Sequence, residues 1–213
     1  MGDEHRMSEQ AFTAISHETC PSLADTLLAV VAAWRPVDHV VLDGQLDQMS
    51  RALFGAAEHD GRTRARTLAA FLTSELNPDP ASVEGLWLDE VLATRRAHPV
   101  MIAALAAELG RRAGWKITVC STPTAWYAGL VEDDVLWLVE PTGAAAGVPT
   151  TVRRHCAHEI AYVVLTGLAE RFESERDRDR ARRLRDHLAL FEAPDGSGDA
   201  LLGALWTKGG SPR

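Results

Sequence analysis

Apolar residues recur every three or four positions over most of the chain, which is the pattern of amphipathic helices. This spacing predicts helices at 24–34, 43–57, 63–76, 88–96, 99–113, 153–172, 175–191 and 200–206. Pro36 ends the first of them. Pro99 opens the fifth at its first turn, where the missing N–H of proline costs no hydrogen bond.

The period changes from 3.6 to 2 in the middle of the chain. Three short stretches rich in β-branched and aromatic residues predict strands at 116–120, 125–130 and 135–140. The acidic run 132–134 predicts a hairpin turn between the last two. Because the helices precede and follow the strands, the order predicts an α+β fold with helices packed around a small antiparallel sheet.

The predicted elements fall into three regions of one compact unit. They are a helical region at 1–84, a core at 85–150 and a C-terminal helical hairpin at 151–213. At roughly 150 residues per domain, a chain of this length makes one domain with a modest extension.

Composition excludes several classes of protein. With 30 acidic and 22 basic residues the net charge is −8, so we expect neither nucleic acid nor an anionic membrane as a partner. The chain has no run of about 18–20 apolar residues and no apolar segment near its start that would form a secretory signal. Its three cysteines are too few for a disulfide framework. We therefore expect a cytoplasmic protein, and the many arginines and alanines suggest a bacterial one.

The motifs with the most information lie between residues 87 and 143. The helix that opens at Pro99 ends in Arg111-Arg112-Ala113-Gly114, and Thr124-Ala125-Trp126 and Val139-Glu140-Pro141-Thr142 follow. This order resembles the transglutaminase-like (papain-like thiol) superfamily. In that family a cysteine opens a helix ending in an Arg-x-x-Gly turn, and a His-Ala-Trp strand and a Val-Asp-Pro-Thr strand end come next. The resemblance implies a transglutaminase-like core.

The run at 88–99 matches a Leu-x-x-Val-Leu-x-x-Arg-Arg-x-x-Pro pattern of a bacterial branch of this superfamily. The resemblance to that branch implies flanking helices and a tetratricopeptide-like tail, and it extends loosely from residue 12 to 191. The branch commonly lacks the cysteine but keeps a Pro-Gly-His-Phe histidine. Aligned on that motif, the family histidine falls on Ala125, whereas aligned on His-Ala-Trp it falls on Thr124. The two registers place it on opposite strand faces, and both stay open.

The resemblance places the family's catalytic cysteine on Pro99 and its aspartate on Glu140. In the family chemistry, the helix dipole lowers the pKa of the thiol, an imidazole takes its proton, and a carboxylate orients the imidazole. Proline has no nucleophilic atom, and neither Thr124 nor Ala125 supplies a base near neutral pH. Acyl transfer through a thioester at this site is therefore excluded.

Other residues are candidates for a pocket or a metal site. The walls of the former cleft are expected to include Pro99, Ala125, Trp126, Tyr127, Arg95 and Arg96. His98 is either a solvated loop residue or a pocket residue that faces Glu140. The stretch 155–159 (HCAHE) invites a metal-dependent hydrolase as a third hypothesis, but it lacks the His-Glu-x-x-His spacing. No metal and no cofactor is predicted.

Two functions remain open, and the first is favoured. In the first, the chain is a non-catalytic transglutaminase-like binding protein that scaffolds or stabilises a partner enzyme, which predicts an exposed apolar patch. In the second, it is an enzyme acting on a small molecule in bacterial biosynthesis, with acid–base chemistry from Glu140, His98 and Thr124. A protein partner is expected in the first case and a small molecule in the second.

Overall fold

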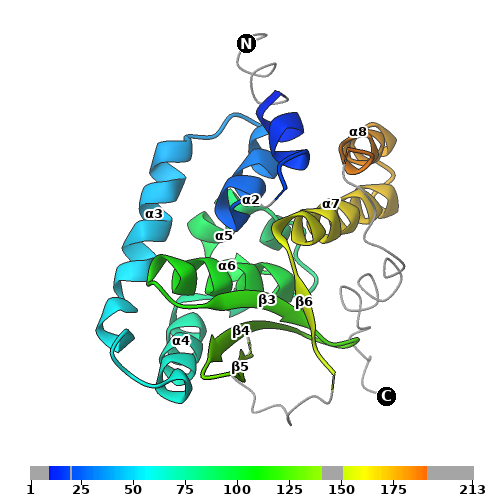
Figure 1. Ribbon diagram of the computed structural model, residues 1–213. Coiled ribbons are helices and arrows are strands. Elements are labelled where there is room, and N and C mark those ends of the chain that lie inside the picture. The colour runs from blue at the N-terminus through cyan, green and yellow to red at the C-terminus, as the bar shows by residue number, and fades with distance from the viewer. Residues whose placement is uncertain (1–9, 20, 141–150, 191–213) are drawn as a thin grey trace.

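The computed structural model confirms an α+β fold, in which most of the helices lie on one side of a small sheet (Figure 1). The structure describes residues 10–19, 21–140 and 151–190. Within these ranges, none of the helices has the length and apolar character that a membrane crossing requires.

Helix α6 (Pro99–Arg112) is the central element of the fold. Every residue from Val100 to Gly110 is buried, and the helix contacts the sheet on one side and other helices around it. Four alanines in this run keep the helix surface narrow, so its neighbours can approach closely. Pro99 is the first helical residue, as the sequence predicts, and two arginines stand in the last turn, where positive charge is favoured by the helix dipole.

The sheet has four antiparallel strands in the order β5-β4-β3-β6. The strands β3 (Ile117–Ser121), β4 (Trp126–Glu132) and β5 (Val135–Val139) confirm the three predicted ones. Asp133 and Asp134 join β4 to β5 with φ values of 48° and 61°. Two successive positive φ angles are those of a type I′ hairpin turn, so the predicted hairpin is confirmed.

The fourth strand, β6 (Arg153–His155), is a correction to the sequence prediction, which begins a helix at residue 153. Strand β6 pairs with β3, with Val119 opposite His155 and Ser121 opposite Arg153. Helix α7 (Ala157–Ser174) starts only after it. The pairing joins residues more than 30 positions apart in the chain, and a window of local sequence holds no signal for it.

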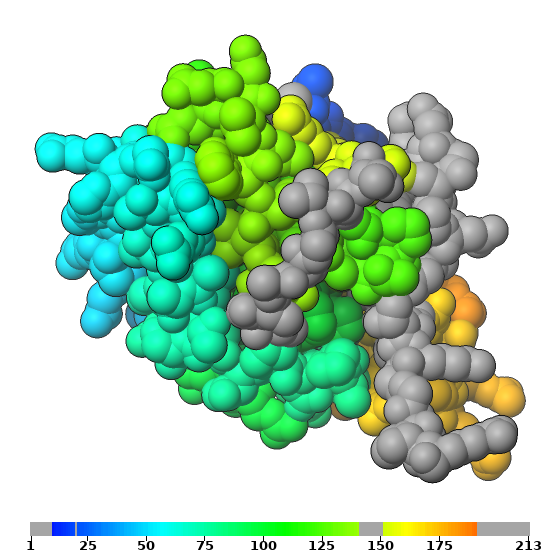
Figure 2. Space-filling view, turned by 90° about the horizontal axis from the view of Figure 1, so that it is seen from below, coloured from blue at the N-terminus to red at the C-terminus, as the bar shows by residue number. Residues whose placement is uncertain are grey.

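The N-terminal helices are α2 (Leu23–Ala32), α3 (His39–Arg51), α4 (Gly61–Glu75) and α5 (Leu88–Thr94), with short 3-10 turns at Phe54–Ala56 and Glu84–Leu86. They confirm the four predicted helices, with ends displaced by a few residues. Two short segments on either side of α5 form a two-residue parallel pair, β1 (Asn77–Pro78) with β2 (Arg96–Ala97). Helix α4 packs against β5, and Figure 2 shows its cyan residues beside the yellow-green strands.

The C-terminal helices α7 and α8 (Arg178–Leu188) pack against each other, and α7 also lies against α2. Arg183 of α8 donates a hydrogen bond to the carbonyl of Ala33 at 2.8 Å and lies over the ring of Trp34. The predicted hairpin is thus attached to the N-terminal helices. The helix predicted at 200–206 lies outside the described residues.

Candidate functional site

The N-terminus of α6, where the resemblance places the catalytic cysteine, has a structural role. His98 is only 2% exposed, so it is not a solvated loop residue. Its Nδ1 accepts the N–H of Val100 at 3.3 Å, and its backbone N–H donates to the carbonyl of Gly85 at 3.0 Å. Pro99 follows at the first helical position and is half-buried. His98 therefore caps α6 directly before Pro99, the position where the resemblance places the family's thiol.

The candidates on the strands differ in exposure and direction. Thr124 is exposed in the turn between β3 and β4, where its N–H donates to the Thr122 hydroxyl at 3.4 Å. Ala125 is half-buried, while Trp126 and Tyr127 are buried on opposite faces of β4. The proposed acid–base role of Thr124, His98 and Glu140 stays a prediction.

Glu140 is half-buried directly after β5. Val139 pairs with Ala128, so strand alternation places Glu140 on the face opposite that of Ala128 and Trp126.

The two candidate arginines already have partners. Arg95 ends α5 with a left-handed φ of 61°, and its guanidinium donates to the sulfur of Met49 at 3.1 Å. Arg96 is exposed and pairs with Asp79. The hydrogen bond from Arg96 lowers the pKa of the Asp79 carboxyl below its usual value. The first contact joins the end of α5 to α3, and the second joins β2 to the residue after β1. Their use in binding an anion stays a prediction.

One face of the sheet points toward α6. A Cβ added to Gly110 of α6 would stand 3.0 Å from the side chain of Ile117, so Ile117 faces this helix. Ser121 lies four residues along the same strand and shares that face. Trp126 pairs with Ser121, and His155 pairs with Val119, which lies two residues before Ser121. Strand alternation therefore places Trp126 and His155 on this same face of the sheet.

These residues bring together a hydroxyl and an imidazole that the sequence analysis missed. The Ser121 Oγ lies 2.8 Å from His155 Nε2. On the other side of the ring, His155 Nδ1 lies 3.4 Å from a carboxylate oxygen of Glu159. We call Ser121, Trp126, His155 and Glu159 the Ser121 cluster. The pairing of β6 with β3 brings these residues together. Because the sequence does not predict β6, it does not predict the Ser121 cluster either.

Burial sets the electrostatics of the Ser121 cluster. The His155 side chain is fully buried, and Ser121 is 6% exposed. Burial lowers the pKa of His155, with the Glu159 carboxylate acting in the opposite direction. The imidazole is therefore neutral near pH 7. Glu159 itself accepts the N–H of Cys156 at 3.0 Å and pairs with Arg153.

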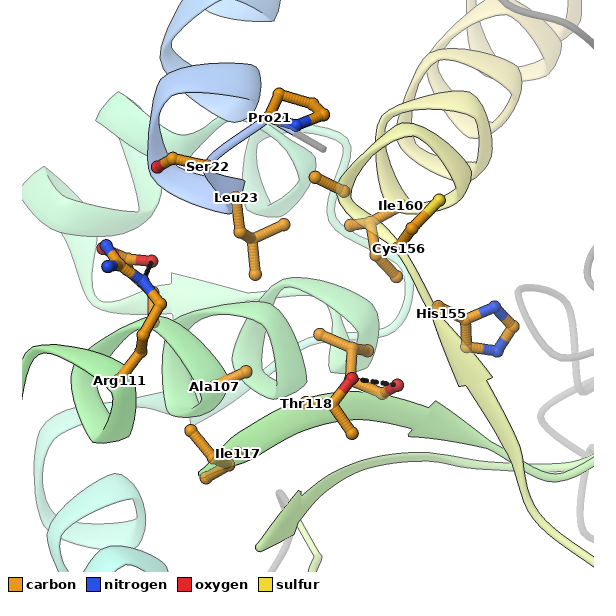
Figure 3. Close-up of a pocket in the computed structure, with 13 residues that line it drawn as sticks. Pro21, Ser22, Leu23, Ala107, Arg111, Ile117, Thr118, His155, Cys156 and Ile160 are labelled. Carbon is orange, nitrogen blue, oxygen red and sulfur yellow. Dashed lines mark hydrogen bonds and ion pairs between the residues drawn. The ribbon is translucent and has the colours of Figure 1, made fainter. Parts of the chain in front are cut away.

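The two cysteines in the described part of the chain lie in different surroundings. Cys120 is fully buried beside Gly129, and burial raises the pKa of its thiol to about 11, so it is a core residue. Cys156 is exposed at the start of α7. In Figure 3 the ring of His155 is turned away from the cavity that Cys156 lines.

That cavity has a volume of about 390 Å³ and lies between α6, β3 and the N-terminal ends of α2 and α7 (Figure 3). Arg111 at its edge is held by Glu108 through two hydrogen bonds of 3.0 and 2.6 Å. Glu108 is 2% exposed and also accepts from Arg112 at 2.7 Å. The charge of Arg111 is thus already compensated inside the protein.

The two histidines of the HCAHE stretch point to separate partners. His155 faces Ser121, whereas Nε2 of His158 lies 2.9 Å from the carbonyl of Ile15. Over residues 10–19, 21–140 and 151–190, no three His, Cys, Asp or Glu side chains come together as metal ligands.

Residues 41–184 match the family model of the transglutaminase-like superfamily. This match covers well over half of the chain, and the chain therefore belongs to that superfamily, as the motifs at 99–142 indicate. No curated protein and no solved structure matches the chain. The matched region runs from α3 into α8 and so includes parts of all three predicted regions, whose boundaries stay predictions.

Proposed function

We propose that this protein acts by binding a protein partner and does not carry out the thioester chemistry of its superfamily. One observation carries the proposal: Pro99 occupies the first position of α6, where the resemblance places the nucleophile. A pyrrolidine ring cannot attack an acyl group. His98 at the adjacent position is engaged in capping the helix, which supports a structural role for this end of α6.

The expected interface is polar. The large apolar side chains most exposed in the described ranges are Val40, Val41, Phe54, Val135 and Leu190. They belong to several different elements, namely α3, the 3-10 turn at Phe54–Ala56, β5 and the residues after α8. The exposed apolar patch expected from the sequence stays a prediction. With a net charge of −8, a basic partner surface gives electrostatic complementarity.

The alternative function is an enzyme acting on a small molecule. With Glu140, His98 and Thr124 as its acid–base groups, it requires all three side chains to reach one bound atom. The capping role of His98 and the exposed turn position of Thr124 give that arrangement little support. Replacement of Glu140 by Gln tests it, because turnover that depends on this carboxylate would be lost while the fold is kept.

Affinity capture of the full chain from its native host, followed by light scattering on the purified complex, tests the proposed function. We expect a defined stoichiometry and an affinity that falls as salt is raised from 50 to 500 mM, because rim charges are screened. The triple variant Cys20→Ala, Cys120→Ala, Cys156→Ala serves as the control and should keep the partner. Recovery of the chain without a partner would contradict the proposal. Loss of the partner in the cysteine variant, traced to Cys156, would contradict it as well.

A further inference from the structure

The geometry points to a second activity beyond partner binding: the Ser121 cluster is a hydrolytic site for small activated acyl esters or thioesters. Ser121 is the nucleophile and His155 the general base. Glu159 is a positioning residue for the imidazole, and the Trp126 indole N–H stabilises the oxyanion. The site uses a hydroxyl where the superfamily uses a thiol, and it lies on β3 and β6 instead of at the start of α6.

The hydroxyl and the base are in hydrogen-bond contact. Ser121 Oγ and His155 Nε2 are 2.8 Å apart, within the range for a nucleophile and its base. The carboxylate of Glu159 faces Nδ1 and can only accept a proton, so it favours the tautomer with hydrogen on Nδ1. Nε2 is then the acceptor, and the Ser121 hydroxyl donates to it.

The carboxylate is held in place behind the imidazole. Glu159 accepts the backbone N–H of Cys156 and pairs with Arg153, so two contacts from the start of α7 and from β6 fix its position. The separation of 3.4 Å from Nδ1 is a few tenths longer than a hydrogen bond. Catalytic hydrogen bonds are often long in the free enzyme and shorten once substrate binds.

Two buried nitrogen atoms, on residues that pair with or contact Ser121, lack hydrogen-bond partners. Among the described residues, neither Trp126 Nε1 nor His155 Nδ1 has one, although Trp126 is 1% exposed. An unsatisfied buried donor costs free energy and is rare in native proteins. Trp126 stands directly opposite Ser121 on the neighbouring strand, and its ring centroid lies 5.1 Å from that of His155. An acyl oxygen bonded to Ser121 would supply the missing acceptor.

The step balances within these groups. Ser121 Oγ attacks the acyl carbonyl as its proton passes to His155 Nε2, and the carbonyl oxygen gains the negative charge that faces Trp126. The intermediate collapses with loss of the alcohol or thiol, which takes the proton from His155. Water then attacks the acyl-serine by the same path and releases the carboxylic acid. Because Ser121 is 6% exposed, the acyl group must be small, such as acetyl.

The first experiment treats the full chain with a fluorophosphonate that carries only methyl substituents, so that it is close to acetyl in size, and locates the modified residue by mass spectrometry. We expect a single phosphonylated serine at position 121, and prior denaturation should abolish the labelling. This readout needs no variant, so it remains decisive even if a substitution unfolds the protein. An unlabelled Ser121 in the folded chain, or labelling of another serine in its place, overturns the inference.

The second experiment measures hydrolysis of p-nitrophenyl acetate by variants. Ser121→Ala should lose at least 10-fold of the rate, whereas Ser50→Ala should keep it, because Ser50 is equally buried but donates only to the carbonyl of Asp47. Trp126→Phe removes the indole N–H together with part of a buried ring, so its thermal stability is measured alongside. In the folded variant kcat should fall by about 100-fold with KM unchanged. Unchanged hydrolysis in Ser121→Ala overturns the inference.

Glu159→Gln keeps a capping oxygen and tests the positioning role. We expect a lower kcat for hydrolysis at unchanged KM. If Glu159 were purely structural, the variant would have a lower melting temperature without a selective fall in kcat. Partner capture with Ser121→Ala separates the two proposals. Lost hydrolysis with a retained partner supports both, and retained labelling without any partner contradicts only the binding function.

Discussion

The α6 N-terminus and the Ser121 cluster lie at neighbouring parts of one fold but use their polar groups differently. At the α6 N-terminus, His98 caps a helix and its backbone is fixed to Gly85. In the Ser121 cluster, a hydroxyl meets an imidazole at 2.8 Å, while the buried Trp126 Nε1 has no hydrogen-bond partner among the described residues. The first region has satisfied its polar atoms within the structure. The second retains an unsatisfied one, which is expected where a ligand binds.

This difference shows that a changed catalytic motif is informative only about the positions in that motif. Pro99 stands where the resemblance places the superfamily's nucleophile, but it gives no information about residues on β3 and β6. A hydroxyl and a base can meet through strand pairing that no short motif records. Functional reasoning from an altered motif therefore needs the sheet register as well.

The largest expected effect comes from Gly85, which supports the α6 N-terminus. A Cβ at this position would lie 2.7 Å from the backbone nitrogen of His98, so Gly85→Ala must displace backbone. We expect a loss of about 1–3 kcal/mol in the free energy of unfolding, measured by urea denaturation. Phosphonylation of Ser121 in the folded fraction should persist, because the α6 N-terminus is structural.

Gly44→Ala is the matched control. Gly44 lies within α3 with nothing inside 4 Å of an added Cβ, so this variant should gain about 0.5–1 kcal/mol. Equal stability changes in the two variants would show that the close contact at Gly85 is unimportant.

An intermediate effect is expected from pH. Because burial lowers the folded-state pKa of His155 below 6.5, the unfolded chain binds more protons, and stability falls as the pH drops through 6.5. One such group contributes up to about 1 kcal/mol between pH 6.5 and 5.5.

Chemical denaturation of the wild type and of His155→Gln at both pH values isolates this contribution. The variant should lose less stability on acidification, since the other titrating groups, including Glu159 beside it, are common to both proteins. Parallel pH dependences in the two proteins would mean that His155 is not held neutral.

The smallest effect is expected from restoring the superfamily's nucleophile. Pro99→Cys should change stability by less than about 1 kcal/mol, and its thiol should form no acyl-enzyme with p-nitrophenyl acetate beyond that of the wild type. Thr124 and Ala125 offer no base to activate it. Mass spectrometry of the protein after a short incubation measures the acylated fraction. A stable thioester at position 99 would show that the superfamily site is still competent.

Much of the fold follows from local patterns. The continuous apolar run of α2, the proline that opens α6 and the acidic turn between β4 and β5 each act over a few residues, so their elements are predicted to within a few positions. Strand β6 is missed because its three residues, Arg153 to His155, carry little β signal and are stabilised by β3. The sequence leaves open whether His98 is solvated, because burial depends on the packing of distant segments.

The sequence by itself determined the superfamily and the α+β order of elements, since these depend on residue identity and on periodicity along the chain. Tertiary structure decided which polar groups meet. Ser121 and His155 are 34 positions apart, and only the antiparallel register between β3 and β6 brings them within hydrogen-bond distance. A register shift of one residue would turn these side chains to opposite faces.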